Sequence, residues 1–306
     1  SLNLVLQDAI SYLKPYVQYL NVPVRINGVN ISQNKYSDIF DVKSENLYKA
    51  EKDKFTTPNN STFTLALNFT NQNIVKVHCT NIVRNSQPIN GEIVLTQGDG
   101  GIYGLRNYFG LAPIPISGFF NLSGVVNLSI LHPTAGREAL SRESIELVSQ
   151  IINTIEFQIA TSISNLELAD SNRGFHNYIS SHNKFDLAKY LKIIVQPNDE
   201  RWNLNKIAPE VGGKKVYYYS GRDPSIILQF GNENSYLLVL SQDNPRRRIQ
   251  LEYIKRLGVE EVPDKARVLK TFENNELSFP EVALILRITN VLNEDYLIAE
   301  SKVYIA

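Results

Sequence analysis

Residues 141–165 read SRESIELVSQIINTIEFQIATSISN, and this stretch decides how the rest of the chain is interpreted. Its apolar residues recur at spacings of three or four, at Ile145, Val148, Ile152, Ile155, Ile159 and Ile163. This spacing places them on one face of a helix of about 25 residues. Ser141 is a good N-cap candidate, because its hydroxyl can accept a backbone N–H of the first turn. We therefore predict one long amphipathic helix that begins after Ser141.

The segment before this helix, residues 62–130, has mostly the pattern of strands. Phe63, Leu65, Leu67 and Phe69 alternate with other residues, which is typical of a half-buried strand. Ile74–Val77 and Ile93–Leu95 predict two more strands. Residues 32–60 are rich in Lys, Ser and Asn, and they predict a polar loop or a weak helix.

At the start of the chain, apolar residues spaced by three and four over residues 3–20 predict a one-faced helix. Pro15 falls inside it, so we expect a kink or two short helices. The alternating residues 22–31, with Asn27-Gly28 between them, predict a small hairpin.

After the long helix, residues 165–180 are expected to form a linker, and a second α/β unit follows. Its predicted parts are a helix at Asp186–Val195, a buried strand at Val216–Tyr219, a turn at 221–224, a short helix, a strand at Tyr236–Leu240 and a helix at Arg246–Leu257. Strands that alternate with helices at this spacing favour a small parallel sheet with helical cover. The tail Leu277–Ile305 is expected to return to strand. The predicted fold class is therefore α/β (α+β), with two α/β subdomains joined by a long helix and a β-rich tail.

Composition excludes several classes of protein. Hydrophobic residues make up 43% and charged residues 20%, which is ordinary for a globular chain. The formal net charge is zero, so the overall field would attract neither nucleic acid nor an anionic membrane. The chain has no apolar run long enough to span a membrane, and its start has no basic region of a secretory signal. The single cysteine, Cys79, fits a reducing compartment, and we expect a cytoplasmic protein.

The common catalytic signatures are missing. The four histidines and Cys79 show no metal-ligand spacing, so no metal site is predicted. The stretch GDGGIYGLRNYFG, residues 98–110, resembles a phosphate cradle only superficially. Such a cradle needs a following helix, and residues 102–109 have at least as much the pattern of a strand. A loop that joins two sheet elements is the favoured interpretation.

Three further features have ordinary structural explanations. Residues 245–248, PRRR, open a predicted helix, where a solvated face is favoured over a nucleic-acid patch. Trp202 is interpreted as a partly buried structural residue rather than an exposed anchor for a partner. Tyr217, Tyr218 and Tyr219 lie in a predicted central strand, so core packing explains them.

Residues 124–141, GVVNLSILHPTAGREALS, carry the most informative pattern. This stretch resembles the 90-kDa heat-shock chaperones of the HtpG type, members of the GHKL ATPase superfamily. Their middle domain has a pattern close to G-V-V-D-S-x-D-L-P-L-N-V-S-R-E-x-L-Q before a long helix. The matching residues are Gly124, Val125, Val126, Leu131, Arg137, Glu138 and Leu140. Residues 215–221, KVYYYSG, also look like the family's strand and turn I-Y-Y-I-T-G.

The resemblance implies a role for one residue in particular. In that family, the Arg of S-R-E reaches the γ-phosphate of ATP held by the preceding domain, and Arg137 occupies this position. A planar, permanently charged guanidinium neutralises phosphate charge as an arginine finger does. The alternative is a surface Arg paired with Glu138 or Glu143. Arg137 is thus the one candidate catalytic and cofactor-binding residue.

The sequence also departs from the family pattern. His132, Thr134, Gly136 and Ser141 replace the family's Pro, Asn, Ser and Gln, and Asn127 replaces its Asp. Asn and Gln belong to the groups that orient the Arg and the phosphate there, so these departures indicate a divergent branch.

The resemblance also implies a division of the chain. Residues 1–31 would be the end of an ATP-binding domain, 32–165 and 166–265 two middle subdomains, and 266–306 a β-rich tail or the start of a further domain. ATP and Mg²⁺ would bind to the full-length protein and not to this region alone. Expected partners are client proteins and the ATP-binding domain of the same chain, with a homodimer left open and with no nucleic acid or membrane. Two alternatives stay open: the middle domain of a DNA-handling ATPase of the mismatch-repair or topoisomerase type, and an interaction module without ATPase coupling.

Overall fold

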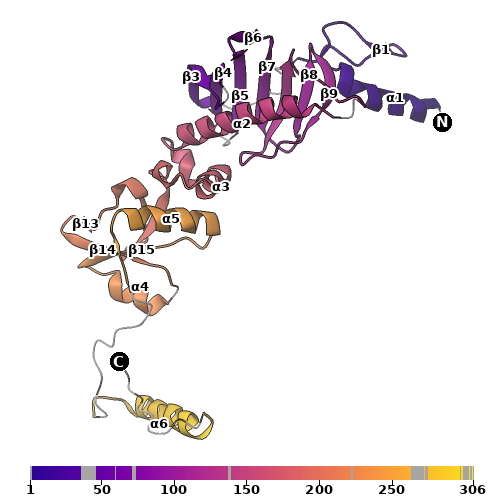
Figure 1. Ribbon diagram of the computed structural model, residues 1–306. Helices are drawn as coiled ribbons and strands as arrows, with labels where there is room; N and C mark the ends of the chain where they lie inside the picture. Colours follow the sequence, from indigo (N-terminus) through magenta and orange to yellow (C-terminus); the bar gives the residue numbers. More distant parts are fainter. Residues whose placement is uncertain are drawn as a thin grey trace.

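The chain forms a mixed α/β fold, as the sequence predicted, and its described part contains two large sheets and one two-stranded hairpin (Figure 1). A computed structural model describes residues 2–35, 46–58, 60–70, 74–136, 139–221, 223–262, 272, 275–296, 298, 303 and 305. Among the helices of this described part, none is both long and apolar enough to cross a membrane.

The first sheet contains eight strands and confirms the predicted strand region. They are β3 (Asn46–Thr56), β4 (Ser61–Thr70), β5 (Val75–Arg84), β6 (Gln87–Ile89), β7 (Gly91–Gln97), β8 (Ile102–Arg106), β9 (Phe109–Ile114) and β10 (Leu122–Leu128). The order is β3-β4-β5-β7-β10-β8-β9, with β6 paired to β5. The β10–β8 pair is parallel, and the other pairs are antiparallel. In β4, buried residues alternate with half-buried ones, so one face of this strand packs into the core.

The long helix α2 (Arg142–Ile163) lies across one face of this sheet (Figure 1). Five residues of its predicted apolar stripe, from Val148 to Ile163, are buried, and Ile145 is half-buried. The predicted cap is also confirmed, because Ser141 Oγ accepts the backbone N–H of Ser144 at 3.3 Å. Helix period and cap signal therefore agree over the stretch on which the sequence analysis depends.

Residues 32–60 differ from the prediction of a polar loop or weak helix, because β3 runs from Asn46 to Thr56. This strand lies at one edge of the sheet and pairs only with β4 among the described strands. Its sequence NLYKAEKDKFT is dense in charge, which edge strands use to discourage pairing with other chains. The charged residues of this edge strand were therefore interpreted wrongly as part of a loop or weak helix.

The N-terminal segment packs at the opposite edge of the sheet. Helix α1 (Leu2–Val17) contacts β9, where the ring centroids of Tyr16 and Phe109 are 6.1 Å apart. Pro15 falls in the last turn of one continuous helix, which ends at Val17. The predicted alternative of two short helices is therefore wrong. The predicted hairpin is confirmed as β1 (Arg25–Ile26) and β2 (Val29–Asn30), with positive φ at both turn residues, Asn27 and Gly28.

The predicted linker at 165–180 is wrong, because this segment is helical and packed. It forms the 3₁₀ helix η2 (Glu167–Asp170) and the helix α3 (Arg173–Ser181), followed by η3 (Phe185–Leu187). Asn172 caps α3 by accepting the N–H of Phe175 at 2.8 Å, and Phe175 and Ile179 are buried. An Asn before a short amphipathic pattern was therefore the start of a helix and not part of a loop.

The predicted helix at Asp186–Val195 is also wrong. Residues 192–196 form strand β11, in which Ile193 and Val195 are buried and Ile194 is exposed. The run KIIVQ has the alternation and the β-branched residues that favour a strand.

The second sheet contains six strands, with helices α4 (Pro224–Phe230) and α5 (Asn244–Arg256) in the same unit. The strands are β11 (Lys192–Gln196), β12 (Glu200–Asn203), β13 (Glu210–Val211), β14 (Lys214–Tyr219), β15 (Ser235–Val239) and β16 (Glu260–Glu261), and the 3₁₀ helix η4 (Leu204–Lys206) follows β12. The order is β12-β11-β15-β14-β13, with β16 paired to β14. Only β14–β15 and β14–β16 are parallel, so the predicted parallel sheet is correct for its centre alone.

The predicted β-rich tail is wrong where the structure describes it. Residues 279–294 form helix α6, and Ser278 and Glu281 make a capping box in which the Ser278 N–H donates to Glu281 Oε2 at 2.7 Å. The apolar run VALILRI had favoured a strand, but the SFPE sequence before it is a helix-start signal. None of the α6 residues is buried.

One buried cluster connects the two sheets. It includes Val77 of the first sheet, Ile155 of α2, Phe175 of α3 and Ile193 of the second sheet. The predicted boundary at residue 165 lies just after the end of α2, but the packing is continuous across it. The division into 32–165 and 166–265 therefore stays a prediction.

Candidate functional site

Arg137, the candidate catalytic residue, lies with Glu138 outside the described residues. The structure does describe the residues on both sides of this pair. Those flanks show how the chain enters and leaves the segment that carries Arg137.

The two flanks are paired with each other. The Thr134 N–H donates to the Ala139 carbonyl at 2.8 Å, and the Ser141 N–H donates to the His132 carbonyl at 2.8 Å. Pro133 and Leu140 form a β-bridge between these two hydrogen bonds. Residues 132–134 and 139–141 therefore run antiparallel, like the base of a hairpin. We call residues 132–141 the Arg137 loop.

The Arg137 loop is tied to α2 and to β8. The backbone N–H of His132 donates to Ser144 Oγ at 3.0 Å, and Ser144 is buried in the first turn of α2. On the other flank, Leu140 is buried against Gly104 of β8, where an added Cβ would come within 2.8 Å of Leu140 Cδ1. Both flanks are thus fixed to regular structure, while Thr134 and Ala139 are exposed.

The Arg137 loop lies beside a second cation that sequence reasoning missed. Arg106, the last residue of β8, has Nη1 at 3.3 Å from Nδ1 of His132. It is exposed, and nothing in the sequence signals the pairing, because the two residues are 26 positions apart. β8 pairs with β9, and β9 contacts α1. The described flanks of the loop therefore lie near the edge of the first sheet at which the N-terminal helix packs.

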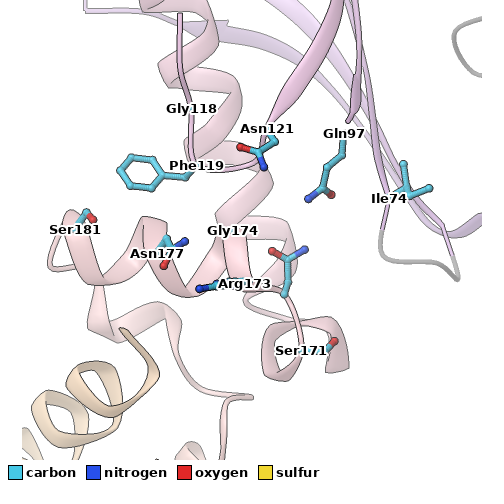
Figure 2. Close-up of a pocket in the computed structure, with 11 residues that line it drawn as sticks. Ile74, Gln97, Gly118, Phe119, Asn121, Ser171, Arg173, Gly174, Asn177 and Ser181 are labelled. Atoms are coloured by element: carbon cyan, nitrogen blue, oxygen red, sulfur yellow. The ribbon is translucent and has the colours of Figure 1, made fainter. Parts of the chain in front are cut away.

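A second candidate site is a hollow of about 790 Å³ between the end of the first sheet and α3, shown in Figure 2. We call it the polar hollow. Gln97 at the end of β7 and Asn121 just before β10 line it on the sheet side. Arg173, Asn177 and Ser181 line it from α3, and their spacing of four places them on one helix face. No sequence motif indicated this site, because its residues come from segments distant in the chain.

The backbone under the hollow is held by a buried carboxylate. Glu156 of α2 accepts the N–H of Phe120 at 3.2 Å through Oε1, and it lies against Gly118, where a Cβ would come within 2.2 Å of that oxygen. Burial raises the pKa of Glu156, and the N–H groups of Phe120 and Phe119 and the charge of His182 offset this only in part. The segment 118–120 also contacts α3, because an added Cβ at Gly174 would come within 2.7 Å of the Phe119 carbonyl. Residues 118–120 and α3 are therefore in close contact, and a side chain at position 174 would force the backbone to shift.

The remaining sequence features have structural roles. Residues 98–100 form a bend that leads into β8 and β9 with no helix after it, so the glycine-rich stretch joins sheet elements as predicted. Trp202 is partly buried, and its ring centroid lies 4.8 Å from that of Tyr236, as expected of a structural residue. Tyr218 and Tyr219 are buried in the core, as predicted.

The PRRR segment is only partly the solvated face that was predicted. Arg246 bonds the carboxylate of Asp170 and donates to the Asp170 carbonyl at 2.7 Å and to the Lys192 carbonyl at 2.6 Å. Arg247 donates to the Ser220 carbonyl, and Arg248 alone is exposed. Arg246 therefore joins α5, η2 and β11 rather than facing solvent.

The described residues contain no group of three or more His, Cys, Asp or Glu placed to hold a metal ion. The sequence matches no protein-family model, and no curated protein is significantly similar to it.

Proposed function

We propose that this chain is the middle region of an ATP-dependent chaperone of the 90-kDa heat-shock type. In this proposal Arg137 contacts the γ-phosphate of ATP held by an N-terminal ATP-binding domain. The sequence resemblance at 124–141 and at 215–221 supports it. The observation that carries it is the anchoring of the Arg137 loop, whose flanks are tied to Ser144 of α2 and to Gly104 of β8.

The physical reason is that an arginine finger must arrive at the phosphate in one defined position. A loop fixed at both flanks meets this need better than a free surface segment. The placement also fits, because the described flanks of the loop lie near the edge of the first sheet at which α1 packs. In the proposal, residues 1–31 belong to the end of the ATP-binding domain. That domain holds ATP and Mg²⁺, and client proteins bind to the middle region in the cytoplasm.

A second candidate function is an interaction module without ATPase coupling. The substitutions around Arg137, such as His132 and Ser141 at the positions of the family's Pro and Gln, favour it, and so does the polar hollow. The two candidates differ in whether ATP turnover depends on this region.

The proposal can be tested with a longer protein that contains the proposed ATP-binding domain. It should bind and hydrolyse ATP, while residues 1–306 alone should bind no ATP in isothermal titration calorimetry. Absence of ATP binding in the longer protein would overturn the proposal and leave the interaction module. Tight ATP binding by residues 1–306 alone would contradict the assignment of the nucleotide to another domain.

A further inference from the structure

We infer that the polar hollow is a binding site for an acidic segment of polypeptide, with Arg173 receiving the carboxylate. The first observation is that four of its polar side chains have unpaired polar atoms among the described residues. Within the described part of the chain, the side chains of Asn121, Arg173 and Asn177 make no hydrogen bond or ion pair. Gln97 Oε1 is shielded from solvent and has no hydrogen-bond donor. Buried polar atoms are normally paired, so an unpaired acceptor in a hollow indicates a donor that arrives from outside.

The second observation is the sign of the charge. Arg173 is exposed, and no acidic residue is among those described as lining the hollow. The nearby carboxylates are already engaged. Asp170 is bonded to Arg246, and Glu156 lies behind Gly118 with its oxygen on the Phe120 N–H. The hollow therefore presents a guanidinium without a counter-charge.

The third observation is the chemistry of the remaining groups. The amides of Gln97, Asn121 and Asn177 each offer donors and an acceptor, as peptide groups do. Pockets for small organic ligands are lined mostly by apolar side chains, and this lining is not. Side-chain amides on both walls suit a main chain that passes between β7 and α3, with one acidic side chain directed at Arg173. As a surface for clients this site rests on the proposed chaperone function, but its binding can be measured without ATP.

The test uses nuclear magnetic resonance on uniformly ¹⁵N-labelled protein, observing the side-chain amides of Gln97, Asn121 and Asn177. The probes are the blocked pentapeptide acetyl-Ser-Gly-Asp-Gly-Ser-amide, the same peptide with Asn in place of Asp, and inorganic phosphate. We expect the Asp peptide to shift these resonances at lower concentration than the Asn peptide. Arg173→Ala should weaken binding of the Asp peptide about tenfold, as expected for loss of a charge-assisted hydrogen bond.

Two further variants complete the design. Arg201→Ala removes the same charge from an exposed position on β12 and should leave the affinity unchanged. Arg173→Gln keeps hydrogen-bonding capacity and should still lose the preference for Asp over Asn. The inference is overturned if the Asp and Asn peptides bind equally, if neither shifts the three amides, or if phosphate alone does. None of these outcomes depends on ATP turnover, so failure here is distinguishable from failure of the proposed function.

Discussion

The backbone N–H of His132 donates to Ser144 Oγ at 3.0 Å, and Ser144 Oγ lies 2.9 Å from Ser141 Oγ. One buried hydroxyl of α2 thus joins the helix cap to the start of the Arg137 loop. In most proteins an N-cap satisfies only the N–H groups of its own helix. Here the same first turn also fixes the segment that carries the candidate arginine.

Replacing Ser144 should therefore loosen both the cap and the loop. Ser144→Ala removes the acceptor of the part-buried His132 N–H and should lower the free energy of unfolding by about 1 kcal/mol. Urea unfolding followed by circular dichroism measures this change. Ser181→Ala, an exposed hydroxyl of α3, is the matched control and should change stability by less than about 0.5 kcal/mol. Equal stability of the two variants would show that the hydrogen bond does not anchor the loop.

The Arg246–Asp170 pair should be important for stability, because both side chains are about one-fifth exposed, at 21% and 19%. Arg246→Ala leaves the Asp170 carboxylate and the Lys192 carbonyl without this partner, and it should cost about 3 kcal/mol. Arg248→Ala removes an exposed hydrogen bond to Asn183 from the same helix and should cost under about 1 kcal/mol. Thermal unfolding of both variants provides the comparison. A cost for Arg246→Ala no greater than that for Arg248→Ala would mean that the pair with Asp170 does not stabilise the fold.

Glu156 should make stability depend on pH. Burial raises its pKa in the folded protein above the ordinary value of 4.5, while the unfolded chain keeps that value. As pH rises from about 4.5, the unfolded state loses the proton first, so the free energy of unfolding falls until the folded pKa is passed. The amide of Glu156→Gln does not titrate, so this decrease in the free energy of unfolding should be absent from the variant.

The measurement is the free energy of unfolding of both proteins from pH 4 to pH 8. Contributions from all other groups are common to both, so the difference between the two curves isolates Glu156. The stability of wild type relative to the variant should decrease as pH rises. A difference that stays flat, or that grows in favour of wild type, would contradict the raised pKa.

Sequence reasoning was sound where local pattern and burial coincide. The stripe from Ile145 to Ile163 and the cap at Ser141 predicted α2, and the alternation from Phe63 to Phe69 predicted β4. In these elements one face is buried, so the period of the apolar residues reports the structure directly.

The errors arose where tertiary context decides. The charged strand β3 is held by pairing with β4, which no local pattern reveals. Residues 192–196 are a short apolar run, for which helix and strand cannot be separated by period alone. In α6 the apolar residues surround the helix, so no stripe indicated it, although the SFPE cap did. The polar hollow could not be predicted at all, because Gln97 and Arg173 meet only in the fold.

The most direct test of the central claim is the rate of single-turnover ATP hydrolysis by a longer protein that contains the proposed ATP-binding domain. Arg137→Ala should lower this rate about 10³-fold or more and leave ATP affinity in the open state nearly unchanged, because the other domain holds the nucleotide. Arg137→Lys should restore little, since an ammonium lacks the planar fork. Arg142 lies five positions after Arg137 and is an exposed arginine paired with Glu146. Arg142→Ala should therefore hydrolyse ATP at the parental rate. A parental rate for Arg137→Ala would contradict the account and assign this region to an interaction module.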